Sequence, residues 1–240
     1  MKKENILIYG LPIFCAIAAI IAYIGVKNNK PVETKKEDSI AFKEEYELLN
    51  DGSTLDMDIP EDNPFVYADY NKLLEVITNG TGIIYLGFPR CPWCRNAIPV
   101  LIDAAKDAEV ETIYYMNILN ERDSFVVEDG KLVYSTDEDG NEKKGTEGYH
   151  KLLKVLDKHL TDYTILFEGK EYETGEKRIY APSIIFVRDG KVLGIHVSTV
   201  DSQENPKDGL TDKQYDELYD IYDDYITKTK GGTCSIGTSC

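Results

Sequence analysis

Residues 82–101 join a short apolar run to a helix-like pattern that begins with two cysteines. Residues 83–88 are almost entirely apolar and end in a turn, which predicts a strand. From Cys91 onward, small and apolar residues recur at helical spacing as far as residue 108. Pro92 suits the first turn of a helix, where its missing N–H would have had no partner. We therefore predict a strand followed by a helix whose first turn carries Cys91-Pro92-Trp93-Cys94.

The position of the two cysteines favours thiolate chemistry. The first turn of a helix offers unpartnered N–H groups and the positive end of the helix dipole, and both stabilise a thiolate at Cys91. Arg90 places a full positive charge next to it. Cys94 follows one turn later on the same face, within reach of a disulfide. Since the thiolate is the nucleophile in disulfide exchange, we predict that Cys91 attacks and that Cys94 resolves the mixed disulfide.

A half zinc site and a pair of inert core thiols are the alternative interpretations of this motif. A structural zinc site takes four ligands and usually combines two such motifs, but Cys234 and Cys240 have poor spacing for the second. The three histidines, His150, His159 and His196, have no surrounding set of acidic or cysteine ligands in the sequence and are interpreted as ordinary surface or core residues. We expect no metal and no cofactor.

Three further features accompany the cysteine motif. Pro99 lies inside the predicted helix, a proline at 182 directly precedes the apolar strand pattern of residues 183–187, and residues 188–194 read as a hairpin. Together with the strand and the C-x-x-C helix, these features resemble the thioredoxin superfamily of thiol–disulfide oxidoreductases, over roughly residues 64–227. The combination of this motif with an apolar N-terminus is most similar to membrane-tethered thioredoxin-like proteins of Gram-positive bacteria, including bacteriocin-transport accessory proteins.

The resemblance implies an α/β fold with a central mixed β-sheet flanked by helices. It also implies a cis bond between Ala181 and Pro182, in a loop held against the cysteines, where backbone groups at 181 pair with an extended substrate. Trp93 is interpreted either as part of an apolar peptide-contact surface or as simple packing.

Tyr85 departs from the family pattern. Many members bury an acidic residue six positions before the first cysteine, where it accepts the proton of the resolving thiol; this chain has Tyr85 there. A tyrosine has an ordinary pKa of about 10 and is a poor base at neutral pH. Proton transfer is therefore expected to use water or another carboxylate, and strong reductase activity is in doubt.

The 240-residue chain carries a net charge of −16 and 42% hydrophobic residues, enough for one large domain with appendages. The negative charge argues against binding to nucleic acid, whose phosphates require Lys and Arg. It argues equally against a surface patch that binds anionic lipid.

The uncharged stretch at residues 6–26 is long enough to cross a bilayer as a helix. A cleaved signal peptide with a small-residue site at residues 16–18 is the alternative, but the apolar run continues beyond that site, which favours an uncleaved anchor. The flanking lysines do not fix the orientation. The short N-terminal arm and the thiol chemistry favour a domain on the extracytoplasmic side of the cell membrane.

We divide the chain into a transmembrane anchor (1–28), a tether with a short helix (29–50), a thioredoxin-like domain (51–230) and a flexible tail (231–240). The segment between Cys94 and Pro182 is longer than the roughly 40 residues expected there for the minimal unit. We therefore expect an insertion at about 121–170 that contains a hairpin and a helix. Other expected elements are strands at 54–59, 65–67 and 112–118, a helix after Asp69 and a last helix at 211–228 after a Thr cap.

Cys234 and Cys240 lie in the Gly-rich tail and are expected to form a second disulfide in an exported protein. Such a disulfide either staples the tail or exchanges with the Cys91–Cys94 pair.

Taken together, the sequence predicts thiol–disulfide exchange with exported protein or peptide substrates, with a membrane redox partner in reach and the direction of exchange open. The alternative is a redox-inert thioredoxin-fold module that assists the export or maturation of a secreted peptide.

Overall fold

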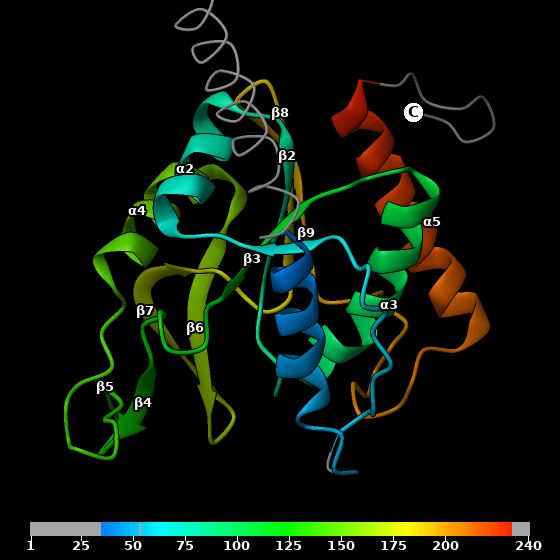
Figure 1. The fold of residues 1–240 in the computed structure, drawn as a ribbon. Helices are drawn as coiled ribbons and strands as arrows, with labels where there is room; N and C mark the ends of the chain where they lie inside the picture. Colours follow the sequence, from blue (N-terminus) through cyan, green and yellow to red (C-terminus); the bar gives the residue numbers. More distant parts are fainter. Residues whose placement is uncertain (1–34, 53, 232–240) are drawn as a thin grey trace, which may run out of the picture.

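The computed structural model describes residues 35–52 and 54–231. Its centre is a five-stranded sheet in the order β1–β3–β2–β8–β9 (Figure 1). The strands are β1 (Phe65–Tyr67), β2 (Gly82–Gly87), β3 (Ile113–Asn117), β8 (Ser183–Arg188) and β9 (Lys191–Val197). Strands β1 and β2 each pair parallel with β3, whereas β8 pairs antiparallel with both β2 and β9. The sheet is therefore mixed, as expected.

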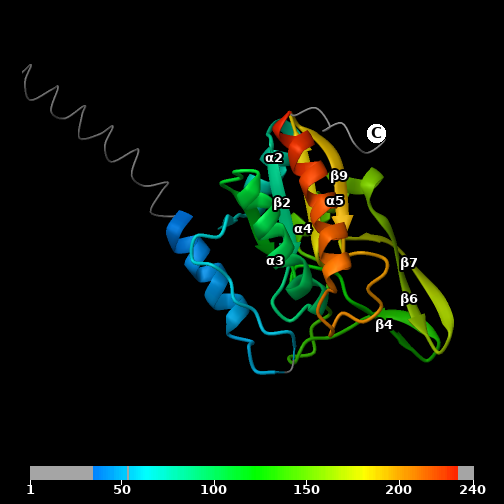
Figure 2. The same ribbon diagram turned by 90° about the vertical axis from the view of Figure 1, so that its right-hand side faces the viewer.

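Helices cover both faces of this sheet (Figure 2). Side chains alternate between the two faces along a strand, so Ile83 and Tyr85 of β2 join one core while Ile84 and Leu86 join the other. The first core also contains α3 (Pro92–Asp107), α5 (Asp212–Lys230) and the helical residues 35–47. The second contains α2 (Tyr70–Asn79) and α4 (Glu147–Leu156). The expected central mixed sheet flanked by helices is confirmed.

Two hairpins lie outside the central sheet (Figure 1). They are β4 (Phe125–Glu128) with β5 (Lys131–Tyr134), and β6 (Thr161–Phe167) with β7 (Lys170–Arg178); a short turn of helix, η1 (Asp157–His159), precedes the second. Asp129 and Gly130 both have positive φ in the first turn, which explains the Asp-Gly pair there. Phe125 stacks on Tyr134 and meets Tyr163 edge-on, with ring centroids 4.4 and 5.8 Å away, and so joins the hairpins.

Helix starts follow the capping residues in the sequence. The Asp69 side chain accepts a hydrogen bond from the Lys72 N–H at the start of α2. Thr211 and Gln214 form a capping box at the start of α5, and Gly231 ends that helix in the left-handed conformation.

The expected strand at residues 54–59 is wrong, because the backbone of this segment pairs with side chains instead of another strand. The Asn50 side-chain amide accepts a hydrogen bond from the Met57 N–H at 2.9 Å and donates one to the Met57 carbonyl at 2.7 Å. The Ile59 N–H donates to the Glu47 carboxylate at 2.7 Å. Met57 and Ile59 are thereby buried under the helical residues 35–47.

The predicted anchor at residues 6–26 and the predicted second disulfide, Cys234–Cys240, lie outside the described residues. Within 35–52 and 54–231, the helices are all too short or too polar to cross a membrane.

Candidate functional site

The two cysteines of the C-x-x-C motif lie at the start of α3, as the sequence predicted. Cys91 is the N-cap of the helix, and its sulfur accepts the Cys94 N–H at 3.2 Å. Pro92 occupies the first turn. Both cysteines are free thiols; Cys94 is fully buried, whereas Cys91 keeps 5% of its surface exposed. The small exposed surface of this pair therefore belongs to Cys91.

The two thiols differ in acidity. The neighbouring Cys94 side chain contributes most to a lowered pKa for Cys91, and the N–H groups of Cys94 and Trp93 and the charge of Arg122 contribute further, against the effect of burial. Burial raises the pKa of Cys94 well above its ordinary value. The neighbouring Cys91 sulfur raises this pKa further. A thiol of lowered pKa beside a buried thiol of raised pKa suits disulfide exchange, in which one thiol loses its proton first and attacks.

The loop before β8 lies against Cys91. The Ala181–Pro182 peptide bond is cis, and the Cys91 thiol donates to the Ala181 carbonyl at 3.2 Å. Pro182 is buried, while Ala181 is half-buried and contacts both cores. Trp93 is half-buried and packs on the edge of the first core, so part of its ring faces outward beside the cysteines.

Arg90 and Arg122 have different surroundings. Arg90, which the sequence singled out as the stabilising charge, is exposed. The positive charge that lowers the pKa of Cys91 belongs to Arg122, which follows β3 and stacks its guanidinium over the Phe88 ring at 5.0 Å. Arg122 is distant from Cys91 in the sequence, so no local motif indicated it; the role of Arg90 stays a prediction.

Tyr85, six positions before Cys91, faces Cys94. Hydrogen bonding to the Tyr85 hydroxyl lowers the pKa of the Cys94 thiol against the effect of burial. The Tyr85 hydroxyl lies 3.4 Å from that of Tyr46, a residue of the N-terminal helical segment 35–47. Burial raises the pKa of both tyrosines, so both hydroxyls are neutral.

A carboxylate lies at the far end of these hydroxyl groups. Tyr46 also interacts with the Tyr115 hydroxyl, which donates to the Glu45 carboxylate at 3.3 Å. Glu45 further accepts hydrogen bonds from Tyr67 and Asn117, each at 2.7 Å. The paired hydroxyls of Tyr85 and Tyr46 thus lie on the side of the buried Cys94, and the Tyr115 hydroxyl contacts a partly exposed acid at the edge of the sheet.

Arg95 directly follows Cys94 and is fully buried. Its guanidinium donates to the carbonyls of Leu55, Tyr46 and Pro89, at 2.5, 2.9 and 3.2 Å, and to the Asn50 side chain at 2.6 Å. These bonds fix the segment after the N-terminal helix, and the loop that leads to Cys91, against α3. No local motif indicated this role.

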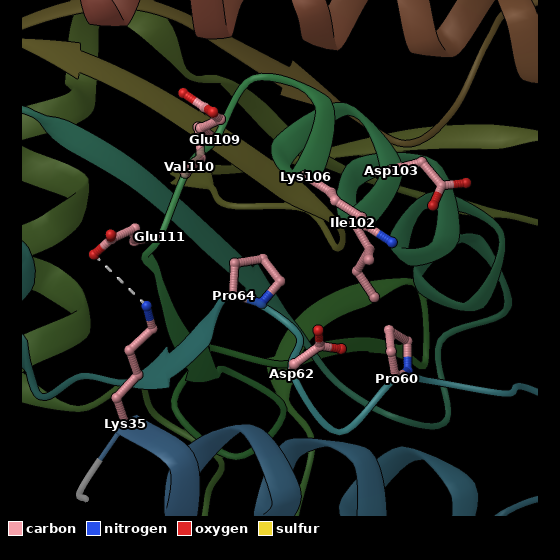
Figure 3. A pocket seen from close by; sticks show the side chains of 10 residues that line it. All are labelled: Lys35, Pro60, Asp62, Pro64, Ile102, Asp103, Lys106, Glu109, Val110 and Glu111. Carbon is pink, nitrogen blue, oxygen red and sulfur yellow. Dashed lines mark ion pairs between the residues drawn. The ribbon is translucent and has the colours of Figure 1, made fainter. Parts of the chain in front are cut away.

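Two pockets of similar size lie in different parts of the domain. One, of about 570 Å³, opens beside the C-terminal half of α3, where Lys35 and Glu111 form an ion pair at 3.9 Å (Figure 3). Its lining combines lysines with several carboxylates and contains no nucleophile. The other, of about 580 Å³, is lined by Arg122 and by Arg178 of β7. Of these two pockets, only the second is lined by a residue whose charge lowers the pKa of Cys91, namely Arg122.

The structure gives no sign of a metal centre in its described part. No group of three or more His, Cys, Asp or Glu side chains within 35–52 and 54–231 is arranged to hold an ion. His150 pairs with Asp123 at 3.0 Å, and the His196 ring bonds the Thr199 carbonyl at 2.9 Å.

Comparisons of the sequence with models of known protein families and with curated proteins found no match.

Proposed function

We propose that this chain is a thioredoxin-like thiol–disulfide oxidoreductase that acts on protein or peptide substrates. The observation that carries the proposal is the unequal thiol pair at the start of α3: Cys91, which is 5% exposed and has a lowered pKa, and Cys94, which is fully buried and has a raised pKa. The mixed sheet, the helices on both faces and the cis Ala181–Pro182 bond are compatible with the thioredoxin-like fold that we propose for it.

In the reducing direction, the Cys91 thiolate attacks one sulfur of a substrate disulfide and forms a mixed disulfide. The other substrate sulfur leaves as a thiolate and takes a proton from solvent. Cys94 then loses its proton and attacks the Cys91 sulfur, which releases the second substrate thiol. The substrate gains two electrons, and the protein is left with a Cys91–Cys94 disulfide; oxidation of a substrate dithiol is the reverse.

We further propose that the hydroxyls of Tyr85, Tyr46 and Tyr115 carry the proton of Cys94 toward Glu45. Each hydroxyl passes on its own proton as it receives one, so no tyrosinate forms. In this route Glu45 accepts the proton that an acidic residue at the position of Tyr85 would otherwise accept.

The test is insulin reduction by the full chain and by two variants. Turnover that is lost in Cys91→Ser supports the enzyme, and a mixed disulfide that accumulates in Cys94→Ser assigns the attacking thiol. If the unaltered chain reduces no insulin and forms no mixed disulfide with it, the redox-inert accessory module is the better account.

We propose that the domain is held at the extracytoplasmic side of the cell membrane by residues 6–26. Protease added to intact cells should then remove the domain, and alkaline carbonate should leave it with the membrane. Survival of the domain until lysis would contradict the orientation, and release by carbonate would contradict the anchor.

We also propose a disulfide between Cys234 and Cys240. Mass spectrometry of non-reduced peptides should show this link, and free thiols at both positions in protein purified without reductant would contradict it. A mixed disulfide of Cys91 with the tail, trapped in Cys94→Ser, would show that the tail exchanges with the site.

A further inference from the structure

We infer that Arg122 and Arg178 form a subsite for a carboxylate of the substrate, beside the sulfur of Cys91. The inference rests on the proposed thiol–disulfide exchange and adds a class of substrate to it: disulfides with a carboxylate close to the reacting cysteine.

The two arginines share one pocket, and their charges are not neutralised by an ion pair. Both line the cavity of about 580 Å³ described above. Arg178 is close enough to lower the pKa of Arg122, whose burial lowers it more. Among the described residues, neither guanidinium lies within ion-pair distance of a carboxylate, and the buried Nε of Arg122 has no hydrogen-bond partner. Two like charges held together in this way favour the binding of an anion.

The carboxylates of the same pocket have other partners. Asp123 accepts the Gly145 N–H at 2.7 Å and pairs with His150 at 3.0 Å. Asp137 accepts the Asn141 N–H at 2.8 Å. The Glu142 carboxylate is 2.6 Å from the ammonium of a neighbouring lysine. These acids therefore stabilise their own loop and leave both guanidinium groups available.

Both guanidinium planes are held in place by aromatic rings. Arg122 stacks over Phe88 at 5.0 Å, and Arg178 stacks over Tyr163 at 4.0 Å. Arg178 also donates from Nη1 to the Asp123 carbonyl at 2.7 Å. Because a fixed guanidinium loses little freedom when it binds, it is suited to a planar carboxylate.

The backbone connects this arginine pair to the reacting sulfur from two sides. The Phe88 carbonyl accepts the Cys91 N–H at 3.1 Å, and the ring of the same residue lies beneath Arg122. Arg178 is three residues before Ala181, whose carbonyl accepts the Cys91 thiol. A substrate joined to Cys91 would therefore bring its neighbouring residues to this pocket. In a chain with a net charge of −16, the pair offers local attraction where the whole surface repels acids.

The experiment compares three peptides that each contain one disulfide and differ in one carboxylate. The first has capped ends and Glu beside the cysteine, the second has Gln there, and the third has Gln and a free C-terminal carboxylate next to the cysteine. The reduced full chain should react with the Glu peptide about tenfold faster than with the Gln peptide in kcat/KM, from hydrogen bonds to a charged group. Added salt should reduce the ratio. The third peptide shows whether a side chain or a chain terminus is the better source of the carboxylate.

Arginine variants test whether the pair causes this preference. Arg122→Gln and Arg178→Gln should bring the ratio close to one, whereas Lys131→Gln, an exposed charge on the first hairpin, should leave it unchanged. Arg122→Lys keeps the charge near Cys91 but not the planar group, so the pH dependence of Cys91 alkylation should change little while the ratio falls. Circular dichroism and thermal melting establish that each variant is folded.

Binding is measured separately from turnover, by anisotropy of labelled peptides in which serine replaces cysteine. Equal binding and equal turnover of the Glu and Gln forms by the unaltered chain would overturn the subsite and leave the oxidoreductase intact. A preference that survives in both glutamine variants would also overturn it. Tighter binding of the Glu form without exchange of any peptide would support the subsite and overturn the proposed enzyme.

Discussion

Replacing Arg95 by methionine should lower the free energy of unfolding by about 3–5 kcal/mol, because each buried acceptor left without a donor costs roughly 1–3 kcal/mol. The guanidinium makes four hydrogen bonds, which connect α3 to Tyr46, Asn50, Leu55 and Pro89. A hydrogen bond to a charged group contributes roughly 1.5–3 kcal/mol, but the sum overstates the loss because burying the guanidinium also costs free energy. Methionine fills most of the volume and leaves the carbonyls without donors.

The assay is urea and thermal unfolding of the oxidised and the reduced full chain. For a domain of this size, a loss of about 3–5 kcal/mol lowers the melting temperature by roughly 6–20 °C. Both redox forms should lose stability, because none of the four partners is a cysteine. Arg188→Met is the matched control. This arginine is exposed and donates one hydrogen bond, to the Lys228 carbonyl at 2.8 Å. Its replacement should change the free energy of unfolding by about 1 kcal/mol or less. A change below about 1 kcal/mol for Arg95→Met would refute the role assigned to the network.

Three other predictions concern the thiols. Alkylation of Cys91 should reach half its maximal rate below pH 9.0, the ordinary value for a thiol, and should precede alkylation of Cys94; faster labelling of Cys94 would reverse the two roles. In the reduced protein, the unfolded chain keeps the Cys91 proton at pH values where the folded chain has lost it. Stability therefore rises with pH between the two pKa values, and Cys91→Ser should abolish this rise in pH-dependent denaturation; an unchanged rise would contradict the lowered pKa. Tyr85→Phe and Glu45→Gln should each slow the second step of exchange, measured as decay of the mixed disulfide in stopped flow, while Glu44→Gln, on an exposed neighbour, should not; equal rates in all three would contradict the proton route.

Elements set by local sequence were predictable. The continuous apolar run of β2, the Asp69 and Thr211 caps and the Asp-Gly turn of the first hairpin all act through neighbours in the chain. The last helix, expected at residues 211–228, is α5 and buries Tyr222 in the core. The hydroxyl of Tyr219 on the same face instead donates to Asp107 of α3 at 2.8 Å, a contact that spacing within one helix does not reveal.

Contacts between distant segments were not predictable in this way. Glu45 and Tyr46 reach the site from a segment interpreted as a tether and a short helix, and Arg122 reaches it from the segment after β3. The burial of Arg95 was not predicted, because an arginine on a helix ordinarily faces solvent. The sequence thus indicated the two reacting sulfurs, while the groups that adjust their acidity depend on tertiary packing.

Equilibration of the full chain with glutathione buffers of graded potential tests the central claim most directly. Trp93, the single tryptophan, lies between the two cysteines and should report their redox state by fluorescence, and peptide mass spectrometry should identify the bond that forms. We predict a two-electron transition with a Cys91–Cys94 disulfide and a potential between about −270 and −120 mV, the range of this chemistry in proteins. The absence of a Cys91–Cys94 disulfide at every glutathione ratio would contradict the account.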